Sequence, residues 1–391
     1  MSDYRPLPVE YKDQYQRLLR YAFQPEEGPD NDEDDGNSDL GDRRGMFDGD
    51  DLLCVCKQYW FTTNVRGDWH QMAGLSAVAS PPESRHGGLV REMLAESLAE
   101  YREKEVYFSA LWPFSYEFYG KYGWATVAKY TRYETTPDAL DLGTEAAGEF
   151  RRLDADDWEL LVALFDAYGE NYALSVDRTE DWWRERVFEG WKKDPYVYAW
   201  LRDGEARSYI VYSVDDEDDG KRLKVWETAS ADDEAYRHLL RFVQYHDSQV
   251  ETVEFLFVPE STDLLDIVAN PRDVECEIRT GPMFRLVDVP RALETISYDA
   301  ETGVVLRVTD PLVGWNDGTF ELDTNGVVRC DRTDADPDVT IDVNTLSQLV
   351  AGYHSVEDAE RFGELDVHEG DARDDLAALF PEEDVYLREH F

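Results

Sequence analysis

The sequence predicts three domains: two of mixed α/β type that share one order of elements, followed by one of α+β type. The chain has 391 residues, more than a single hydrophobic core usually serves. Hydrophobic residues make up 42% of it and aromatic residues 13%, which is enough apolar surface for packed domains despite 32% charged residues. Segments with a period of two residues alternate with segments of period 3.6, as expected for strands and helices that share a core.

The first third opens with a helix and continues as an antiparallel meander. Residues 9–23 carry tyrosine, leucine and phenylalanine side chains at helical spacing, and an acidic stretch at 26–42 is expected to form a loop. Short β-like runs follow at 45–47, 52–65 and 74–79, with turn residues between them.

A βαβ unit comes next. Apolar residues recur with period 3.6 over 89–101 and predict a helix, and 106–111 returns to the strand pattern. Residues 116–122 predict a short helix and 124–134 a further strand.

The second third repeats this order in a different sequence. Helices are expected at 157–167 and 181–188, strands between 196 and 228, then a helix at 232–245 and a strand at 250–258. Residues 229–233, which precede that last helix, end in two aspartates where a phosphate would need bare amide groups. We therefore expect the second copy to be catalytically silent.

The last part of the chain, from residue 287, predicts an α+β domain. Strands are expected at 304–308, 320–323 and 327–331, with helices at 344–351 and 371–379.

The formal charge of -47 arises from 86 acidic and 39 basic residues, and the acids are scattered along the whole chain. Nucleic-acid binding is disfavoured, because no basic face is available to displace the counterions of phosphates. This composition is typical of a halophilic protein with a solvated acidic surface. Long-range attraction of a cationic substrate is the alternative, but at 1 M salt the Debye length falls to about 3 Å and such attraction is screened.

The four cysteines, Cys54, Cys56, Cys276 and Cys330, have neither the spacing of a metal site nor that of a disulfide framework. They indicate a reducing compartment and no metal. No apolar run approaches the roughly 18 residues of a membrane span, and the first residues lack the pattern of a secretion signal. We expect a cytoplasmic protein without a membrane span.

A glycine-containing turn precedes the helix at 89–101. Gly87 and Gly88 would let a phosphate approach the free amide groups at the helix N-terminus. The basic residues of this segment are Arg85, His86 and Arg91. Arg85, Gly88 and Val90 fit the pattern Arg/Gln-x-x-Gly-x-Gly/Ala loosely, because the last position holds valine. An ordinary strand-to-helix turn is the alternative reading.

A tyrosine-rich segment follows the second strand of the βαβ unit. An acyl transfer from a thioester needs a proton donor near the sulfur, and a tyrosine hydroxyl can serve. Tyr116, Tyr119 and Tyr122 are all candidates, and their spacing does not choose among them. Packing in the core is the alternative role for each.

Four features together resemble the enhanced intracellular survival (Eis) family. They are the run at 74–79, the turn at 82–93, the segment at 118–123 and the terminal Phe391. That family joins an active GNAT (acyl-CoA N-acyltransferase) domain, a degenerate GNAT domain and a C-terminal domain like sterol carrier proteins (SCP2-like). The resemblance spans nearly the whole chain and implies domains at residues 1–136, 137–286 and 287–391.

The resemblance also implies roles for individual residues. Backbone groups of Ala77, Val78 and Ala79 would receive the pantetheine arm of acetyl-CoA. The pyrophosphate would bind at Arg85, His86, Gly87, Gly88 and Leu89. Tyr119 lies at the family's general-acid position, and Phe391 matches the terminal residue whose carboxylate faces the active site. His390 departs from the family, whose members carry an acid there that helps to attract cationic amines.

These features predict an N-acetyltransferase that moves acetyl directly from acetyl-CoA to a primary amine of a small molecule or peptide. No cysteine falls in the expected site, which argues against a thiol relay. The alternative is a non-catalytic lipid- or CoA-sensing protein that uses the third domain. The resemblance further implies a homo-oligomer, either a trimer or a hexamer.

Overall fold

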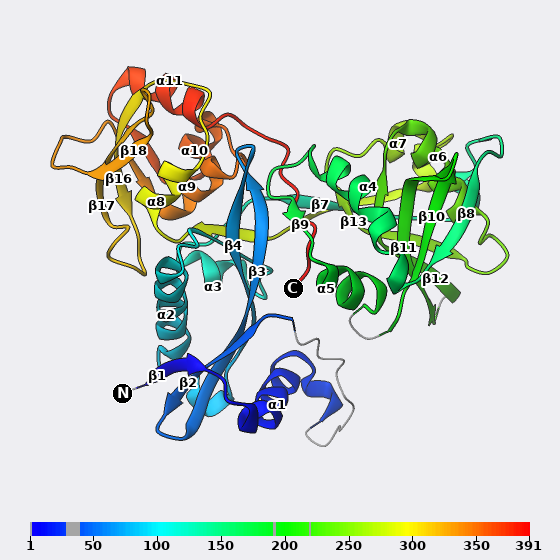
Figure 1. Cartoon of the computed structure of the whole chain (residues 1–391), viewed down its shortest axis with the longest axis horizontal. Helices are drawn as coiled ribbons and strands as arrows, with labels where there is room; N and C mark the ends of the chain where they lie inside the picture. Colours follow the sequence, from blue (N-terminus) through cyan, green and yellow to red (C-terminus); the bar gives the residue numbers. More distant parts are fainter. Residues whose placement is uncertain (1, 29–39, 191–192, 219) are drawn as a thin grey trace. The chain divides into compact units, whose positions relative to one another are not determined.

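The computed structural model describes residues 2–28, 40–190, 193–218 and 220–391, which form two compact units (Figure 1). The first unit contains the described residues up to Ala128 together with Pro282–Phe391, and the second contains those of Lys129–Gly281. The predicted third domain therefore packs with the first domain into one unit. The acidic loop expected at 26–42 falls largely on 29–39, outside the described residues.

The first unit is built on a mixed sheet. Its strand order is β1 (Asp3–Pro6), β2 (Asp42–Asp48), β3 (Asp51–Val65), β4 (Asp68–Ala79), β5 (Phe108–Leu111), β15 (Met283–Leu286) and β6 (Ala125–Thr126). Strands β1 to β4 are antiparallel, whereas β4 and β5 run parallel, as the predicted βαβ unit requires. The helices of this region are α1 (Lys12–Phe23), α2 (Leu89–Glu103) and α3 (Tyr116–Gly120).

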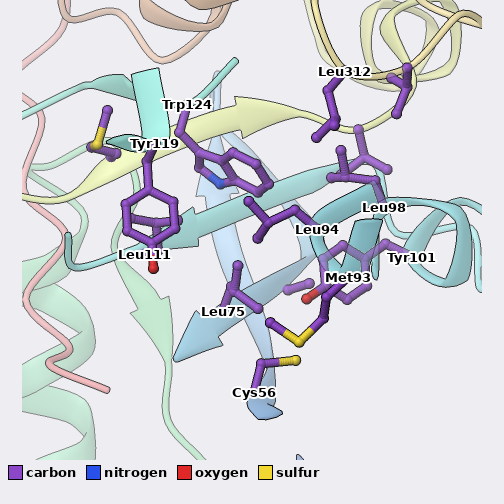
Figure 2. Close-up of a cluster of buried hydrophobic side chains, with 14 of the residues drawn as sticks. Cys56, Leu75, Met93, Leu94, Leu98, Tyr101, Leu111, Tyr119, Trp124 and Leu312 are labelled. Carbon is purple, nitrogen blue, oxygen red and sulfur yellow. The ribbon is translucent and has the colours of Figure 1, made fainter. Parts of the chain in front are cut away.

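Helix α2 covers one face of this sheet with the apolar stripe that its sequence predicts. Met93, Leu94, Leu98 and Tyr101 are fully buried and pack in one cluster with Leu75 of β4 (Figure 2). Burial of each large apolar side chain contributes about 1.5–3 kcal/mol, so this cluster fixes α2 against the strands that precede and follow it.

The strands do not follow the expected domain boundaries at 136 and 286. The single strand expected at 124–134 is divided into β6, in the first sheet, and β7 (Lys129–Thr135), in the second. Strand β15 lies inside the expected second domain by sequence, yet it pairs with β5 and β6 of the first sheet. All four residues of β15 are buried. Its pairing on both sides depends on strands far away in the sequence, so local patterns do not encode it.

The second unit repeats the architecture. Its strand order is β14 (Glu275–Thr280), β7, β13 (Thr252–Pro259), β12 (Gly220–Ser230), β11 (Glu205–Glu217), β10 (Tyr196–Arg202) and β8 (Glu149–Leu153). Strands β12 and β13 are parallel and α6 (Asp233–Gln244) connects them, as α2 connects β4 and β5. The other helices are α4 (Glu159–Gly169), α5 (Glu180–Trp182), which continues as a π-helix over Trp183–Phe188, and α7 (Leu264–Ile267).

The third predicted domain has a sheet of order β18 (Arg329–Arg332), β17 (Gly318–Asp323), β16 (Gly303–Thr309), β19 (Val339–Asp342) and β20 (Leu365–Val367). Its helices are α8 (Val289–Thr295), α9 (Val343–Val350), α10 (Val356–Phe362) and α11 (Gly370–Leu379). The sequence patterns missed β19, β20, α8 and α10, which are short. Among the described residues, no helix is long and apolar enough to cross a membrane.

A buried arginine joins this domain to the β3–β4 hairpin. Arg66, in the turn of the hairpin, is 8% exposed and donates from Nε to the carbonyl oxygen of Val350 at 2.9 Å. Its Nη2 donates to the carbonyl of Leu349. These carbonyls end α9, where the helix dipole favours a cation, so the hairpin caps a helix of the third domain.

Candidate active site

Strands β4 and β5 pair over only three residues and then separate. Their parallel ladder runs from Met72 opposite Phe108 to Gly74 opposite Ala110, while β4 continues to Ala79. Among the described strands, only β3 pairs with the last residues of β4, so the side that faced β5 is available to another extended chain. The sequence-predicted Ala77, Val78 and Ala79 lie in this segment.

A β-bulge shapes the same segment. On β3, Val55 pairs with Ala79 and Lys57 pairs with Ser76, so that two residues of β4 stand opposite one residue of β3. Ala77 has φ of +52°, a left-handed conformation that a residue with a Cβ adopts rarely. The bulge reorients backbone groups next to the point where β4 and β5 separate.

The turn before α2 is open at the helix N-terminus. Gly88 is the N-cap residue with φ of +84°, and no side chain caps the first turn. The four residues from Arg85 to Gly88 are exposed, so the first amide N–H groups of α2 can donate hydrogen bonds to an anion. Arg85 donates from Nε to the carbonyl of Ser80 at 3.2 Å. Val90, which departs from the expected motif, packs against the core beneath α2.

The structure separates the three candidate tyrosines. Tyr119 is 4% exposed and belongs to the cluster under α2, at one end of it and beside Leu111 (Figure 2). Tyr116 is 37% exposed, and Tyr122 is partly buried after the end of α3. Burial raises the pKa of Tyr119 well above its ordinary value, and Cys56 adds to the rise. Tyr119 therefore keeps its proton and can act as a donor.

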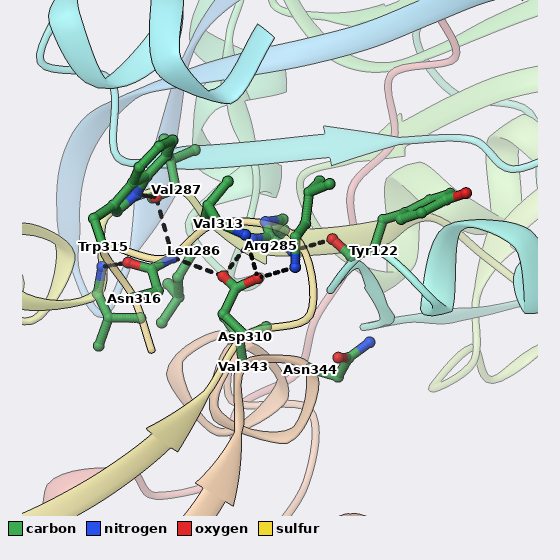
Figure 3. A network of polar contacts seen from close by, with 12 residues as sticks. Tyr122, Arg285, Leu286, Val287, Asp310, Val313, Trp315, Asn316, Val343 and Asn344 are labelled. Carbon is green, nitrogen blue, oxygen red and sulfur yellow. Dashed lines mark hydrogen bonds and ion pairs between the residues drawn. The ribbon is translucent and has the colours of Figure 1, made fainter. Parts of the chain in front are cut away.

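A buried ion pair holds the turn that follows α3 (Figure 3). Arg285 of β15 and Asp310 are both fully buried, with Nη2 and Oδ2 2.5 Å apart. Arg285 also donates to the carbonyl of Tyr122. Gly123 has φ of +92°, and a Cβ there would lie 1.6 Å from Nη1 of Arg285, so only glycine fits.

Asp310 and its neighbours complete this network. Oδ1 of Asp310 accepts from the backbone N–H of Leu312 and Val313 at 2.9 and 3.1 Å, and Oδ2 accepts from Asn316 at 3.0 Å. The buried charges are thus paired and hydrogen-bonded, as burial requires.

Helix α9 of the third domain binds the same turn. Nδ2 of Asn344 donates to the carbonyl oxygens of Gly120 and Trp124 at 3.0 and 2.9 Å, one on each side of Gly123. The third domain therefore fixes the segment that carries Tyr119, a contribution that the sequence motifs did not predict.

The last residues of the chain lie where β4 and β5 separate. The ring of Phe391 is 5.0 Å from that of Phe61 and 5.8 Å from that of Tyr59, measured between centroids. A Cβ on Gly74 would lie 2.8 Å from the Phe391 ring, so this glycine makes room for it. Gly74 is the last residue of β4 that pairs with β5.

Trp112, just after β5, contacts Glu389 and His390, the two residues that precede Phe391. Its Nε1 donates to the carbonyl of Glu389 at 2.7 Å, and its ring stacks on His390 with centroids 3.8 Å apart. No sequence pattern predicted a role for Trp112, because its partners are some 280 positions away in the sequence.

Phe391 and Tyr119 lie on opposite faces of the sheet. Gly74 and Phe61 point to the face of Phe391, whereas Ala73 and Leu75 point to the face of α2 and Tyr119. The opening between β4 and β5 therefore has Tyr119 on one side and Phe391 on the other.

Three family models match successive parts of the chain. A model described as an acetyltransferase (GNAT) domain matches residues 3–127, a second with that description matches 174–286, and a sterol carrier protein domain matches 289–388. The protein named N-acetyltransferase Eis from Mycobacterium tuberculosis is 27% identical over 309 residues, covering 72% of this chain and 71% of that protein. The chain is a GNAT acetyltransferase with a sterol carrier protein domain, and it is similar to the Eis proteins.

Three further proteins are similar to this chain. A protein of Streptomyces griseus named uncharacterized N-acetyltransferase is 28% identical over 342 residues, covering 82% of each chain. The solved structure of Eis1 from Mycobacterium abscessus covers 100% of both chains with a TM-score of 0.77 and 22% identity. A GCN5-related N-acetyltransferase from Anabaena variabilis covers 100% of both with a TM-score of 0.83 and 19% identity. At these identities the two structures show the shared fold. The family models and the named relatives show that this chain is an acyltransferase, and they do not favour the alternative of a lipid- or CoA-sensing protein.

Proposed function

We propose that the first domain transfers acetyl directly from acetyl-CoA to a primary amine at the opening between β4 and β5. The observation that carries this proposal is the placement of Tyr119 and Phe391 on opposite faces of that opening. A thioester lying between the strands would have a proton donor on one side and the end of the chain on the other.

The side of β4 that lies beyond its ladder with β5 supports the binding of acetyl-CoA. Ala77, Val78 and Ala79 would bond the amides of the pantetheine arm, which would extend the sheet as an added strand next to the bulge. The pyrophosphate would lie on the open N-terminus of α2, at Arg85, His86, Gly87, Gly88 and Leu89. Basic groups at this turn offset the repulsion between a chain of charge -47 and a polyanionic substrate.

The proposed reaction moves three protons. The ammonium group of the acceptor gives one to the α-carboxylate of Phe391, directly or through a water, and the neutral nitrogen then bonds to the carbonyl carbon of the thioester. The carbon–sulfur bond breaks, and Tyr119 protonates the departing thiolate. The product nitrogen then gives its remaining extra proton to the tyrosinate through water, which restores Tyr119 and leaves a neutral amide. Because burial raises the pKa of Tyr119, the hydroxyl stays protonated until the thiolate forms nearby.

The second copy lacks the corresponding turn, so we propose one acetyl-CoA per chain. The acceptor is a small molecule or a peptide that carries a primary amine. We further propose that the protein works in a salt-rich cytoplasm as a homo-oligomer, a trimer or a hexamer, in line with its acidic composition.

The test is thiol release at high salt from acetyl-CoA and a panel of amines, comparing the wild type with variants of the chain end. Extension by one glycine moves the carboxylate away and should lower kcat by about 100-fold or more, within the range of acid–base catalysis. Phe391→Leu keeps a carboxylate at the same position and serves as the matched control. An unchanged rate in the extended protein would remove the carboxylate from the mechanism, and no thiol release with any amine would contradict the whole proposal.

A further inference from the structure

The edge strand β14 of the second sheet is uncovered on both faces. It pairs with β7 and is the last strand of the sheet over the described residues. All six of its residues, Glu275 to Thr280, are exposed. Exposed edges are usually protected, because their free backbone groups can pair with another chain.

The face of β14 that continues the core is apolar and open. Cys276 pairs with Tyr133 and Ile278 pairs with Thr131, so these side chains point to the same side as two buried residues of β7. Ile278 is nevertheless 57% exposed. The core of the second unit therefore ends at this strand without a cover.

The charged residues on the other face of β14 are complementary to those of a second, antiparallel copy of the same strand. Glu277 and Arg279 flank Ile278, and within one chain their side chains form an ion pair of 2.7 Å. In an antiparallel pair centred on Ile278, Glu277 would face the partner's Arg279, and Arg279 would face the partner's Glu277. Cys276 would face the partner's Thr280. A parallel pair in register would instead place like charges together.

We propose that two copies of this chain join through β14, in an antiparallel pair about a twofold axis at Ile278. The pair would make a continuous sheet across the two subunits, cover Ile278 with its counterpart, and use both charges of each strand. The proposal rests on the homo-oligomer proposed above and names one of its interfaces, and it is independent of the acetyl-transfer reaction. A twofold contact gives dimers or, combined with trimers, hexamers, and it excludes a lone trimer.

Charge reversal tests the register. Glu277→Arg and Arg279→Glu each place like charges opposite one another twice in the dimer, whereas the double variant restores two opposite pairs. We expect each single variant to weaken the twofold association by about tenfold or more and the double variant to recover it, measured by sedimentation at the lowest salt that keeps the protein folded. Single variants that sediment as the wild type, or a double variant that stays dissociated, would overturn the proposed pairing.

A disulfide tests the axis. In an antiparallel pair, opposite Cα atoms lie about 4.5 or 5.5 Å apart, and both spacings fall within the roughly 4.4–6.8 Å that a disulfide spans. Ile278→Cys in a Cys276→Ser background should therefore give a covalent dimer on mild oxidation. Val327→Cys in the same background is the control, since Val327 is 75% exposed on another part of the chain.

The outcomes separate the two proposals. A trimer or hexamer that shows no cross-link at residue 278 overturns the β14 contact but leaves the homo-oligomer. A wild type that stays monomeric at micromolar concentration overturns both. Acetyl transfer, assayed in the same samples, is expected to be unchanged in every variant.

Discussion

The two acyltransferase-like copies share a βαβ core and differ where a ligand would bind. In both, a helix leads from one parallel strand to the next: β4, α2 and β5 in the first copy, and β12, α6 and β13 in the second. In the first copy, Gly88 leaves the amide groups of α2 uncapped. In the second, Asp232 accepts from the N–H of Ala235, and Asp233 and Glu234 add negative charge to the first turn. Over the described residues, the N-terminal amides of α2 therefore have no capping side chain, whereas a side chain of the same copy caps the N-terminus of α6.

The short helices after the parallel strands differ as well. Helix α3 of the first copy carries Tyr119, whereas α7 of the second reads Leu-Leu-Asp-Ile and has no hydroxyl to donate a proton. Both copies keep a bulge in the strand before the helix, since Val211 pairs with Glu227 and Tyr212 with Val225, which leaves Trp226 without a counterpart. The indole of Trp226 bonds to Ser213 at 3.0 Å. The comparison teaches that the fold persists without the groups that we propose to bind and react.

The largest expected effect concerns the ion pair that holds the turn after α3. Asp310→Ala would leave Arg285 buried and unpaired, which should lower the free energy of unfolding of the first unit by about 3–5 kcal/mol. Denaturant unfolding measures the change. Glu117→Ala, which removes an exposed i,i+4 pair with Lys121 on α3 itself, is the control and should cost no more than about 0.5 kcal/mol. Equal losses would show that the buried pair is not what holds α3.

Replacement of the proposed proton donor should have the next largest effect. Tyr119→Phe is expected to lower kcat by about 100-fold and to spare acetyl-CoA binding, because only the hydroxyl is removed. Since burial raises the pKa of Tyr119, the wild-type rate should not fall at alkaline pH until above the ordinary tyrosine value of about 10. Tyr116→Phe is the matched control. Equal loss of binding and turnover in Tyr119→Phe would contradict its role as an acid.

An acidic residue at the N-cap of α2, like Asp232 at the N-cap of α6, should weaken the binding of acetyl-CoA. Gly88→Asp adds a negative charge beside the open amides, and we expect the Kd to rise by about tenfold, or about 1.4 kcal/mol. Gly88→Asn has the same size and tolerates a positive φ, so it isolates the effect of charge. Calorimetry on both variants gives the comparison, and identical Kd values would place the pyrophosphate elsewhere.

The smallest effect is expected from the reverse change. Asp232→Ala removes the cap of α6 and its ion pair with Arg207, which should destabilise the second unit by about 1 kcal/mol. Binding should stay at one acetyl-CoA per chain, because uncapped amides alone do not supply the basic turn. A second equivalent bound by this variant would mean that the aspartate is all that keeps the second copy empty.

Much of this architecture could be predicted because local patterns encode it. The apolar stripe of α2, strand β3 and the glycine turn at Gly88 appear in the structure close to their expected positions, whereas β4 begins at Asp68, six residues before the run expected at 74–79. Local periodicity could not show that β15 completes the first sheet or that β6 and β7 enter different sheets, since both outcomes depend on partners far away in the sequence.

The sequence by itself determined the residue types of the site: a glycine turn with basic neighbours, a tyrosine in a short helix, and a phenylalanine at position 391. Only the tertiary structure decided which tyrosine is buried, since Tyr119 and Tyr116 have the same hydroxyl but are 4% and 37% exposed. It also decided that Trp112, Gly74 and Phe391 meet at the end of the β4–β5 ladder. Such contacts are stabilised by burial between distant segments, and no local pattern records burial of that kind.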